Sequence, residues 1–163
     1  MAKMIDEDDA IILTPDGHKR MMETLEHLKT EHREEIRERM KNLEKGGEMS
    51  EDPEYEEIKK DQSILESRIA QIENILARAK VLTKGEITTD KVGIGSKVKI
   101  QNLKSKGTEE YTILSTMEAD PEKGYISDVC PVGRALMRAK RGDVVYAITP
   151  QGRVRYLIMD IKR

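Results

Sequence analysis

The chain has 163 residues, of which 37% are charged and only 3% aromatic, with no Trp and no Phe. Large compact cores depend on big aromatic side chains, so this composition argues against one globular domain and favours long, solvent-exposed helices. The formal net charge of −2 argues against a general nucleic-acid binder, which would carry a strong basic excess.

The first predicted element is a long helix that begins after Thr14, with Thr14 as the N-cap and Pro15 in the first helical position. From there to about Lys45 the chain has no further proline. Apolar or semi-apolar residues recur mostly three or four positions apart, which predicts one narrow stripe along the helix. The residues of this stripe are Met21, Leu25, Leu28, His32, Ile36, Met40 and Leu43.

Gly46-Gly47 ends this helix, and Asp52-Pro53 is a second pair of N-cap and first-turn residues. The next stripe alternates steps of four and three, which is typical of a coiled-coil seam with one polar position. Its residues are Ile58, Gln62, Leu65, Ile69, Ile72, Leu76 and Ala79. Each helix would be roughly 40 Å long at ~1.5 Å per residue. Two such stripes joined by a short break predict an antiparallel helical hairpin.

After Val81-Leu82 the pattern changes to short alternating segments around residues 98–100, 111–113, 144–148 and 154–161. Thr149-Pro150-Gln151-Gly152 reads as a hairpin turn, and Arg134 to Ala139 as one short helix. We therefore expect an α+β protein. Residues 1–82 form the helical hairpin with its tip at 46–54, residues 83–95 a linker, and residues 96–163 a mostly antiparallel β domain with a short helix.

Cys130 is the only cysteine, which excludes an internal disulfide and fits a reducing cytoplasm. The acidic first ten residues lack the features of a signal peptide, and no apolar run approaches the ~20 residues that a membrane helix needs. We expect a soluble, cytoplasmic monomer without a membrane partner.

The predicted hairpin tip carries an unusual concentration of acid, with seven carboxylates and one base between Glu44 and Glu57. One interpretation is a solvated loop whose acids favour the nearby helix N-terminus. The other is metal chemistry, because Mg²⁺ is often held by only one or two carboxylates together with waters and phosphates. Glu48 and Glu51 would make a poor site alone, but they could complete a metal site that another protein supplies.

The sequence resembles the GreA/GreB transcript-cleavage factors over nearly the whole chain. The family opens with Leu-Thr-x-x-Gly, and this chain has the similar segment Leu13-Thr14-Pro15-Asp16-Gly17. The tip from Gly47 to Tyr55 is similar to the family signature Gly-Asp-Leu-Ser-Glu-Asn-Ala-Glu-Tyr. Further matches follow in order: Glu66-Ser67-Arg68-Ile69, Glu118-Ala119-Asp120-Pro121, Cys130-Pro131-Val132-Gly133-Arg134-Ala135-Leu136, Gly142-Asp143 and Thr149-Pro150-Gln151-Gly152.

The resemblance implies a coiled-coil hairpin and an FKBP-like C-terminal domain that docks on RNA polymerase beside its secondary channel. The tip would approach the catalytic Mg²⁺ of the polymerase, whose own active site would cut the 3′ end of backtracked nascent RNA. This chain would be an accessory factor with no cofactor of its own. The family's metal-binding tip carboxylates correspond to Glu48 and Glu51, with Asp52 as a further candidate.

Other functional residues are also implied by the resemblance. Lys59 and Lys60 would steer the RNA, although ordinary solvated charges explain them equally well. Four residues are candidates for polymerase docking, or equally for structural turns: Asp120, Pro121, Cys130 and Pro131. We interpret the Cys130 thiol as buried and inert, His32 as a residue of the helix stripe, and the other histidines as surface residues without a partner at metal-ligand spacing.

Two alternative functions remain open. At the tip, Glu48, Asp52 and Pro53 replace the family's Asp, Asn and Ala, and the extra acid resembles the Gre-like inhibitors that block the channel without supporting cleavage. A peptidyl-prolyl isomerase would also fit an FKBP-like fold. Its pocket would need an aromatic lining, however, and this domain offers only four tyrosines, at 111, 125, 146 and 156.

Overall fold

In the computed structural model, residues 10–47 and 52–163 are described. The chain divides into two compact units, with boundaries after Gly17 and after Arg78. We call residues 18–78 the hairpin unit, and residues 10–17 together with 79–163 the sheet unit. None of the helices in the described part is long and apolar enough to span a membrane.

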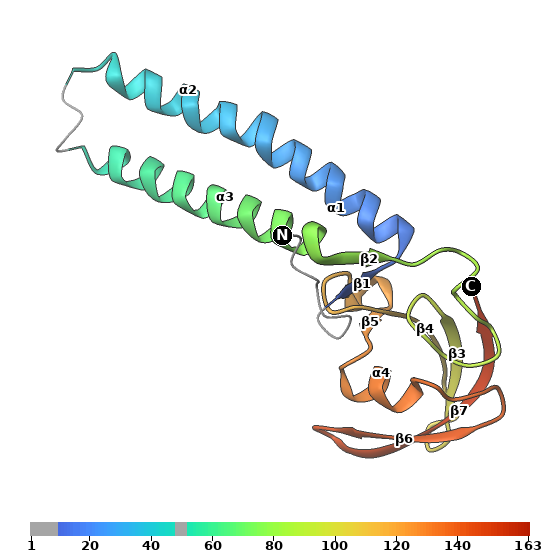
Figure 1. The fold of residues 1–163 in the computed structure, drawn as a ribbon. Coiled ribbons are helices and arrows are strands. Elements are labelled where there is room, and N and C mark those ends of the chain that lie inside the picture. Colours follow the sequence, from blue (N-terminus) through green and yellow to red (C-terminus); the bar gives the residue numbers. More distant parts are fainter. Residues whose placement is uncertain (1–9, 48–51) are drawn as a thin grey trace. The chain divides into compact units, whose positions relative to one another are not determined.

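The hairpin unit consists of two long helical segments joined at the tip (Figure 1). The first runs through α1 (Pro15–His27), a π-helical turn η2 (Leu28–His32) and α2 (Arg33–Glu44), and the second is α3 (Pro53–Arg78). Ion pairs join Lys29 to Glu73, Arg33 to Glu66 and Arg39 to Asp61. Residue numbers rise along one helix as they fall along the other. The predicted antiparallel hairpin is therefore confirmed.

The seam between the helices is centred on Leu28, Leu65 and Ile69, which are buried. Three half-buried residues pack around them: Leu25, Ile36 and Ile72. Full burial of such side chains contributes roughly 1.5–3 kcal/mol each, whereas an exposed ion pair contributes ~0–1 kcal/mol. The apolar seam therefore supplies most of the stability of the hairpin.

The π-helical turn changes which residues face the seam. His32 was predicted to belong to the stripe, and this is wrong, because its side chain is exposed. A π turn holds more residues than an α turn, so Arg33 becomes half-buried instead. The same turn brings His27 against His32, with their Nδ1 atoms 3.1 Å apart. The sequence did not predict this pairing, because residues five apart do not face each other in an α-helix.

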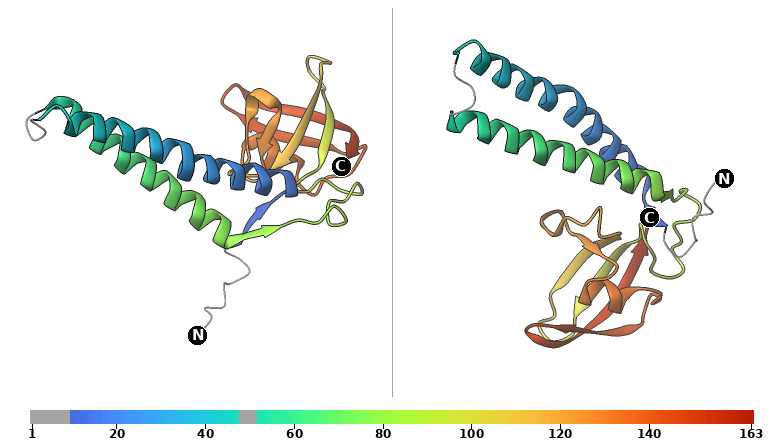
Figure 2. Two further views of the ribbon diagram at one scale, coloured as in Figure 1. Left: turned by 90° about the horizontal axis from the view of Figure 1, so that it is seen from above. Right: turned by 60° about the vertical axis from the view of Figure 1, so that its left-hand side comes forward.

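The sheet unit holds a five-stranded sheet in the order β5-β4-β3-β7-β6. Its strands are β3 (Lys97–Asn102), β4 (Thr108–Leu114), β5 (Tyr125–Ser127), β6 (Val144–Thr149) and β7 (Gly152–Lys162). All neighbours are antiparallel except β4 and β5, which are parallel. The predicted hairpin turn is confirmed, since Thr149 pairs with Gly152. Figure 2 shows the curled sheet from two sides.

A separate parallel pair joins the two segments that lead into and out of the hairpin unit. Strand β1 (Ile11–Leu13) lies beside β2 (Ala79–Val81), and Leu82 donates its backbone N–H to the carbonyl of Leu13 at 2.9 Å. The sequence did not predict this pair or strand β5. Each has only three residues, too few to show a pattern.

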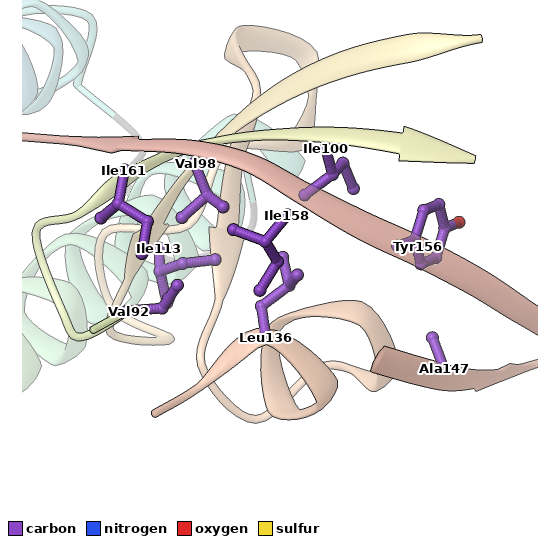
Figure 3. Close-up of a cluster of buried hydrophobic side chains, with 9 residues drawn as sticks. All are labelled: Val92, Val98, Ile100, Ile113, Leu136, Ala147, Tyr156, Ile158 and Ile161. Carbon is purple, nitrogen blue, oxygen red and sulfur yellow. The ribbon is translucent and has the colours of Figure 1, made fainter. Parts of the chain in front are cut away.

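Helix α4 (Pro131–Leu136) packs against the sheet through Leu136. The sequence placed this helix at Arg134 to Ala139, which is wrong at both ends. It begins earlier because Pro131 takes the first helical position, and Cys130 Sγ accepts the backbone N–H of Gly133 at 3.2 Å. Figure 3 shows Leu136 beside Ile158. The buried cluster of the sheet unit consists of Val92, Val98, Ile100, Ile113, Leu136, Ala147, Tyr156, Ile158 and Ile161.

Candidate functional site at the hairpin tip

The two helix ends that border the tip are well defined. Helix α2 ends at Glu44, and Gly46 donates its backbone N–H to the carbonyl of Leu43 at 2.9 Å. Gly47 follows with φ of +96°, a left-handed conformation that glycine adopts without steric cost. Glu48 and Glu51, the predicted metal-binding residues, lie outside the described residues, so their role stays a prediction.

Asp52 is the one predicted metal-binding carboxylate that the structure describes, and it caps helix α3. Its Oδ1 accepts the backbone N–H of Glu54 at 2.9 Å, and its carbonyl accepts that of Tyr55 at 3.0 Å. The predicted N-cap is therefore confirmed. One carboxylate oxygen is thus already engaged with the helix, and any part that Asp52 takes in metal binding competes with this bond.

The two predicted RNA-proximal bases lie within the first two turns of α3, and both are exposed. Lys59 Nζ lies 3.7 Å from a carboxylate oxygen of Glu56 and 5.2 Å from the centre of the Tyr55 ring. Exposed pairs of this kind are weak. Lys59 therefore remains available to another anion, and Lys60 points to solvent from the same part of the helix.

Further from the tip, a groove with a volume of about 590 Å³ lies between α2 and α3. Gln62, the one polar position of the predicted seam, lines this groove and is exposed. The amide cannot be buried without hydrogen-bond partners, so the seam stays open at this level. The other lining residues are Arg33, Ile36, Arg37, Met40, Lys41, Glu44, Leu65 and Glu66.

The predicted docking residues flank the short strand β5 in the sheet unit. Asp120 exchanges two backbone hydrogen bonds with Tyr125, at 2.8 and 3.0 Å, and Cys130 donates its N–H to the carbonyl of Ser127 at 3.1 Å. The hydrogen bond from Lys123 holds the pKa of the Asp120 carboxyl below its ordinary value. The structure thus gives both motifs a turn-forming role, and the docking role stays a prediction.

Cys130 is half-buried rather than buried, which corrects the sequence-based interpretation. Its Sγ caps helix α4, and the next residue, Pro131, is exposed. The thiol therefore has a structural role as the cap of α4, and the sequence did not predict this role.

Comparison with known proteins now identifies the family. The family model described as "Transcription elongation factor, N-terminal" matches residues 11–81, and "Transcription elongation factor, GreA/GreB, C-term" matches residues 87–163. The chain belongs to the GreA/GreB family of transcription elongation factors. The predicted resemblance is confirmed over nearly the whole chain.

Individual GreA/GreB relatives agree with this assignment. Transcription elongation factor GreA of Acetivibrio thermocellus is 41% identical over 94% of this chain and 96% of its own length. GreA of Alkaliphilus oremlandii is 42% identical over 96% of this chain and 98% of its own length. The crystal structure of GreA factor homolog 1 (Gfh1) of Thermus thermophilus is 29% identical over 94% of this chain and 99% of its own. The two structures superpose with a TM-score of 0.44.

Tyr111 and Tyr156 of this GreA/GreB chain both pack with the buried cluster of the sheet unit, whereas Tyr146 lies on the opposite face of the sheet. Tyr156 belongs to the buried core, where burial raises the pKa of its hydroxyl. Tyr146 is exposed, under the Arg153 guanidinium at 4.2 Å from the ring centre. Because Tyr156 pairs with Val145 on the neighbouring strand, it points to the opposite face from Tyr146.

Tyr111 is half-buried and donates its hydroxyl to a carboxylate oxygen of Glu109 at 2.9 Å. Burial and this carboxylate together raise the pKa of Tyr111 to about 12. Within the described residues of the GreA/GreB chain, no group of three or more His, Cys, Asp or Glu side chains is placed to hold a metal ion.

Proposed function

We propose that this GreA/GreB family protein binds RNA polymerase, delivers its acidic hairpin tip to the polymerase active site through the secondary channel, and stimulates cleavage of backtracked RNA 3′ ends. The supporting observation is a stiff helical hairpin whose two ends at the tip are anchored by Gly47 and Asp52. Only four residues lie between these anchors, and two of them are glutamates. The acids are thus carried at the far end of a long rigid element.

The stiffness of the hairpin follows from its packing. The apolar seam supplies the stability of the hairpin. Three ion pairs between the helices, spread along the hairpin from Lys29–Glu73 to Arg39–Asp61, fix the register of one helix against the other. Arg33 binds both carboxylate oxygens of Glu66, at 2.8 and 2.7 Å. Bidentate ion pairs of this kind are geometrically more specific than single contacts. A hairpin with fixed register places its tip with the precision that catalysis needs.

In this proposal Glu48 and Glu51 help to hold a Mg²⁺ ion that belongs to the polymerase. Carboxylate oxygens are the hard ligands that Mg²⁺ takes, and one or two are enough when phosphates and waters complete the site. Bound there, the metal would supply an activated water and charge stabilisation for phosphodiester cleavage. The chain itself acts as an accessory factor, and its residues position the oxygen ligands.

The test is a stalled, backtracked elongation complex with Mg²⁺, in which release of short 3′ RNA fragments is measured. We expect the protein to accelerate release, and Glu48→Ala and Glu51→Ala to lower the maximal rate by at least about 100-fold, as for other groups that stabilise charge in a transition state. Glu38→Ala is the matched control, since this exposed carboxylate lies on α2 away from the tip. No fragment release by the parent protein would reject the proposal.

A second candidate function is inhibition of the polymerase by blocking the same channel. The tip sequence favours it, because Asp52 and Pro53 make the loop more acidic and stiffer than the family signature. It predicts slower nucleotide addition, relieved when Glu51→Gln and Asp52→Asn remove charge. Unchanged elongation rates at saturating protein would exclude it.

A further inference from the structure

Two residues that the proposed function leaves unused, Thr14 and Glu118, meet in the sheet unit. Glu118, in the Glu-Ala-Asp-Pro motif, is buried with 9% of its surface exposed. Its carboxylate accepts two hydrogen bonds from Thr14, in the Leu-Thr-x-x-Gly motif. One comes from the backbone N–H at 2.9 Å and the other from the hydroxyl at 2.5 Å. A buried carboxylate is costly unless it is hydrogen-bonded, and these two donors offset part of that cost.

The arrangement is a capping box whose carboxylate comes from a distant part of the chain. In an ordinary capping box, a Glu at the third helical position reaches back to the backbone N–H of the N-cap residue. Here the third position of α1 is Gly17, which donates its backbone N–H to Thr14 Oγ1 at 3.1 Å. Glu118, separated from Thr14 by 104 positions, supplies the missing carboxylate.

Gly17 makes room for this carboxylate. A Cβ atom built at position 17 would lie 1.6 Å from Glu118 Oε1 and 2.1 Å from its Cδ. Glycine in a helix otherwise costs about 1 kcal/mol relative to alanine. The glycine therefore disfavours α1 by itself and is explained by the close approach of Glu118. We call Thr14, Gly17 and Glu118 the clasp.

The clasp lies where the chain leaves the sheet unit. The chain crosses between the two units only after Gly17 and after Arg78. The β1–β2 pair holds these two segments side by side. Glu118 connects these segments to a third one, the turn after β4. This turn begins at Ser115, whose carbonyl accepts the Glu118 N–H at 3.0 Å. The first turn of α1 is thereby fixed to the sheet unit.

We propose that Glu118 is a positioning residue, whose clasp holds the direction in which the hairpin leaves the sheet unit. Its importance for RNA cleavage rests on the proposed function. If the sheet unit docks on the polymerase, the clasp determines how often the tip reaches the active site. The affinity for polymerase is set elsewhere. Loss of the clasp therefore lowers the maximal cleavage rate and leaves the half-saturating concentration of factor unchanged.

The first experiment needs no polymerase. Spin labels are attached at Glu38→Cys in the hairpin unit and Lys104→Cys in the sheet unit, in a Cys130→Ser background. They report the distribution of distances between the units. We expect Glu118→Ala and Gly17→Ala to broaden this distribution by at least about twofold. Thr14→Ser keeps the hydroxyl and the N–H, so it should match the parent. Glu122→Ala, an exposed carboxylate four positions away, is the control.

The second experiment measures fragment release by the same variants over a range of factor concentrations. We expect Glu118→Ala to lower the maximal rate about tenfold, with the half-saturating concentration within twofold of the parent. Glu118→Gln keeps one acceptor oxygen for the Thr14 N–H and should recover most of the rate.

The outcomes distinguish the two proposals. If the parent protein releases no fragments, the proposed function fails, and the distance distributions still decide the clasp. Unchanged distributions in folded Glu118→Ala and Gly17→Ala, or equal broadening in Glu122→Ala, would overturn the inference. Should Glu118→Ala fail to fold, Gly17→Ala provides the same comparison. A change in the half-saturating concentration alone would assign Glu118 to docking instead, which also contradicts the positioning role.

Discussion

Replacing Asp52 by alanine or by asparagine separates helix capping from metal binding at the hairpin tip. Its Oδ1 accepts the Glu54 N–H at 2.9 Å, so alanine removes both the cap and the charge. Asparagine caps a helix as well as aspartate does, but it carries no charge. It is also the residue of the family signature at this position. Both variants therefore lose the negative charge, but only Asp52→Asn keeps the cap.

The size of the capping effect can be estimated from this hydrogen bond. Loss of an Asp N-cap costs about 1 kcal/mol, within a range of roughly 0.5–2 kcal/mol. A difference of 1 kcal/mol is about a fivefold change in an opening equilibrium. We expect the amides of the second turn of α3, at residues 57–60, to exchange with solvent about fivefold faster in Asp52→Ala. In Asp52→Asn they should exchange within about twofold of the parent rate.

Hydrogen exchange and RNA cleavage, measured on the same samples, then assign the role. If Asp52 only caps α3, asparagine leaves both the exchange and the maximal cleavage rate near the parent values. A tenfold or larger fall in cleavage with Asp52→Asn, at unchanged exchange, would place this carboxylate in the metal site. Equal exchange in Asp52→Ala and the parent would refute the capping argument itself.

Three further predictions concern stability. Gln62→Leu should stabilise the hairpin by about 1 kcal/mol in denaturant unfolding, because leucine fills the groove that the exposed amide leaves open. Gly133→Ala should destabilise the sheet unit by about 1–3 kcal/mol in the same assay, since a Cβ there would lie 2.0 Å from the carbonyl oxygen of Ser127. Acid should weaken the hairpin through Glu66, whose pKa is lowered by the hydrogen bond from Arg33. The stability from this pair is therefore fully present above the unfolded pKa of glutamate, and it is lost as the pH falls through the lowered pKa of the folded state. Thermal unfolding between pH 6 and 2 would measure this loss.

Each of these predictions has a matched control. Gln71→Leu adds the same side chain at an exposed position of α3 outside the seam, so it should give no gain. Gly85→Ala has no atom within 4 Å of the added Cβ and should be close to neutral. Glu66→Gln should flatten the acid dependence, whereas Glu38→Gln should not. Matching effects in a variant and its control would contradict the corresponding argument.

Local chemistry explains which parts of the fold could be predicted from the sequence. Thr14 and Asp52 cap helices because each has a short acceptor side chain directly before a proline. The apolar stripe of α3 and the Thr149–Gly152 turn likewise depend on neighbours in the sequence. The π turn at Leu28–His32 has no such local signal, and it places Arg33 instead of the predicted His32 at the seam.

The candidate site was predictable to a different extent. Acidic composition and the family signature located the tip, and Asp52 indeed caps α3 there. Glu48 and Glu51 remain a prediction, because they lie outside the described residues. The clasp could not be predicted, since hydrogen bonds over 104 positions leave no periodic pattern. The available signals were two motifs of unknown purpose and a glycine inside a predicted helix.

The two long helical segments of the hairpin begin with the same physical device used in two ways. At the base, the carboxylate that completes the cap of α1 comes from Glu118, is buried, and ties the helix to another part of the chain. At the tip, the capping carboxylate is the neighbouring Asp52, and it remains half-exposed. A buried carboxylate that accepts two hydrogen bonds fixes the position of the helix start, because its loss leaves buried donors unpaired. A half-exposed carboxylate among like charges is instead relieved by a cation. In the functions that we propose, the base of the hairpin holds its direction and the tip meets a metal ion.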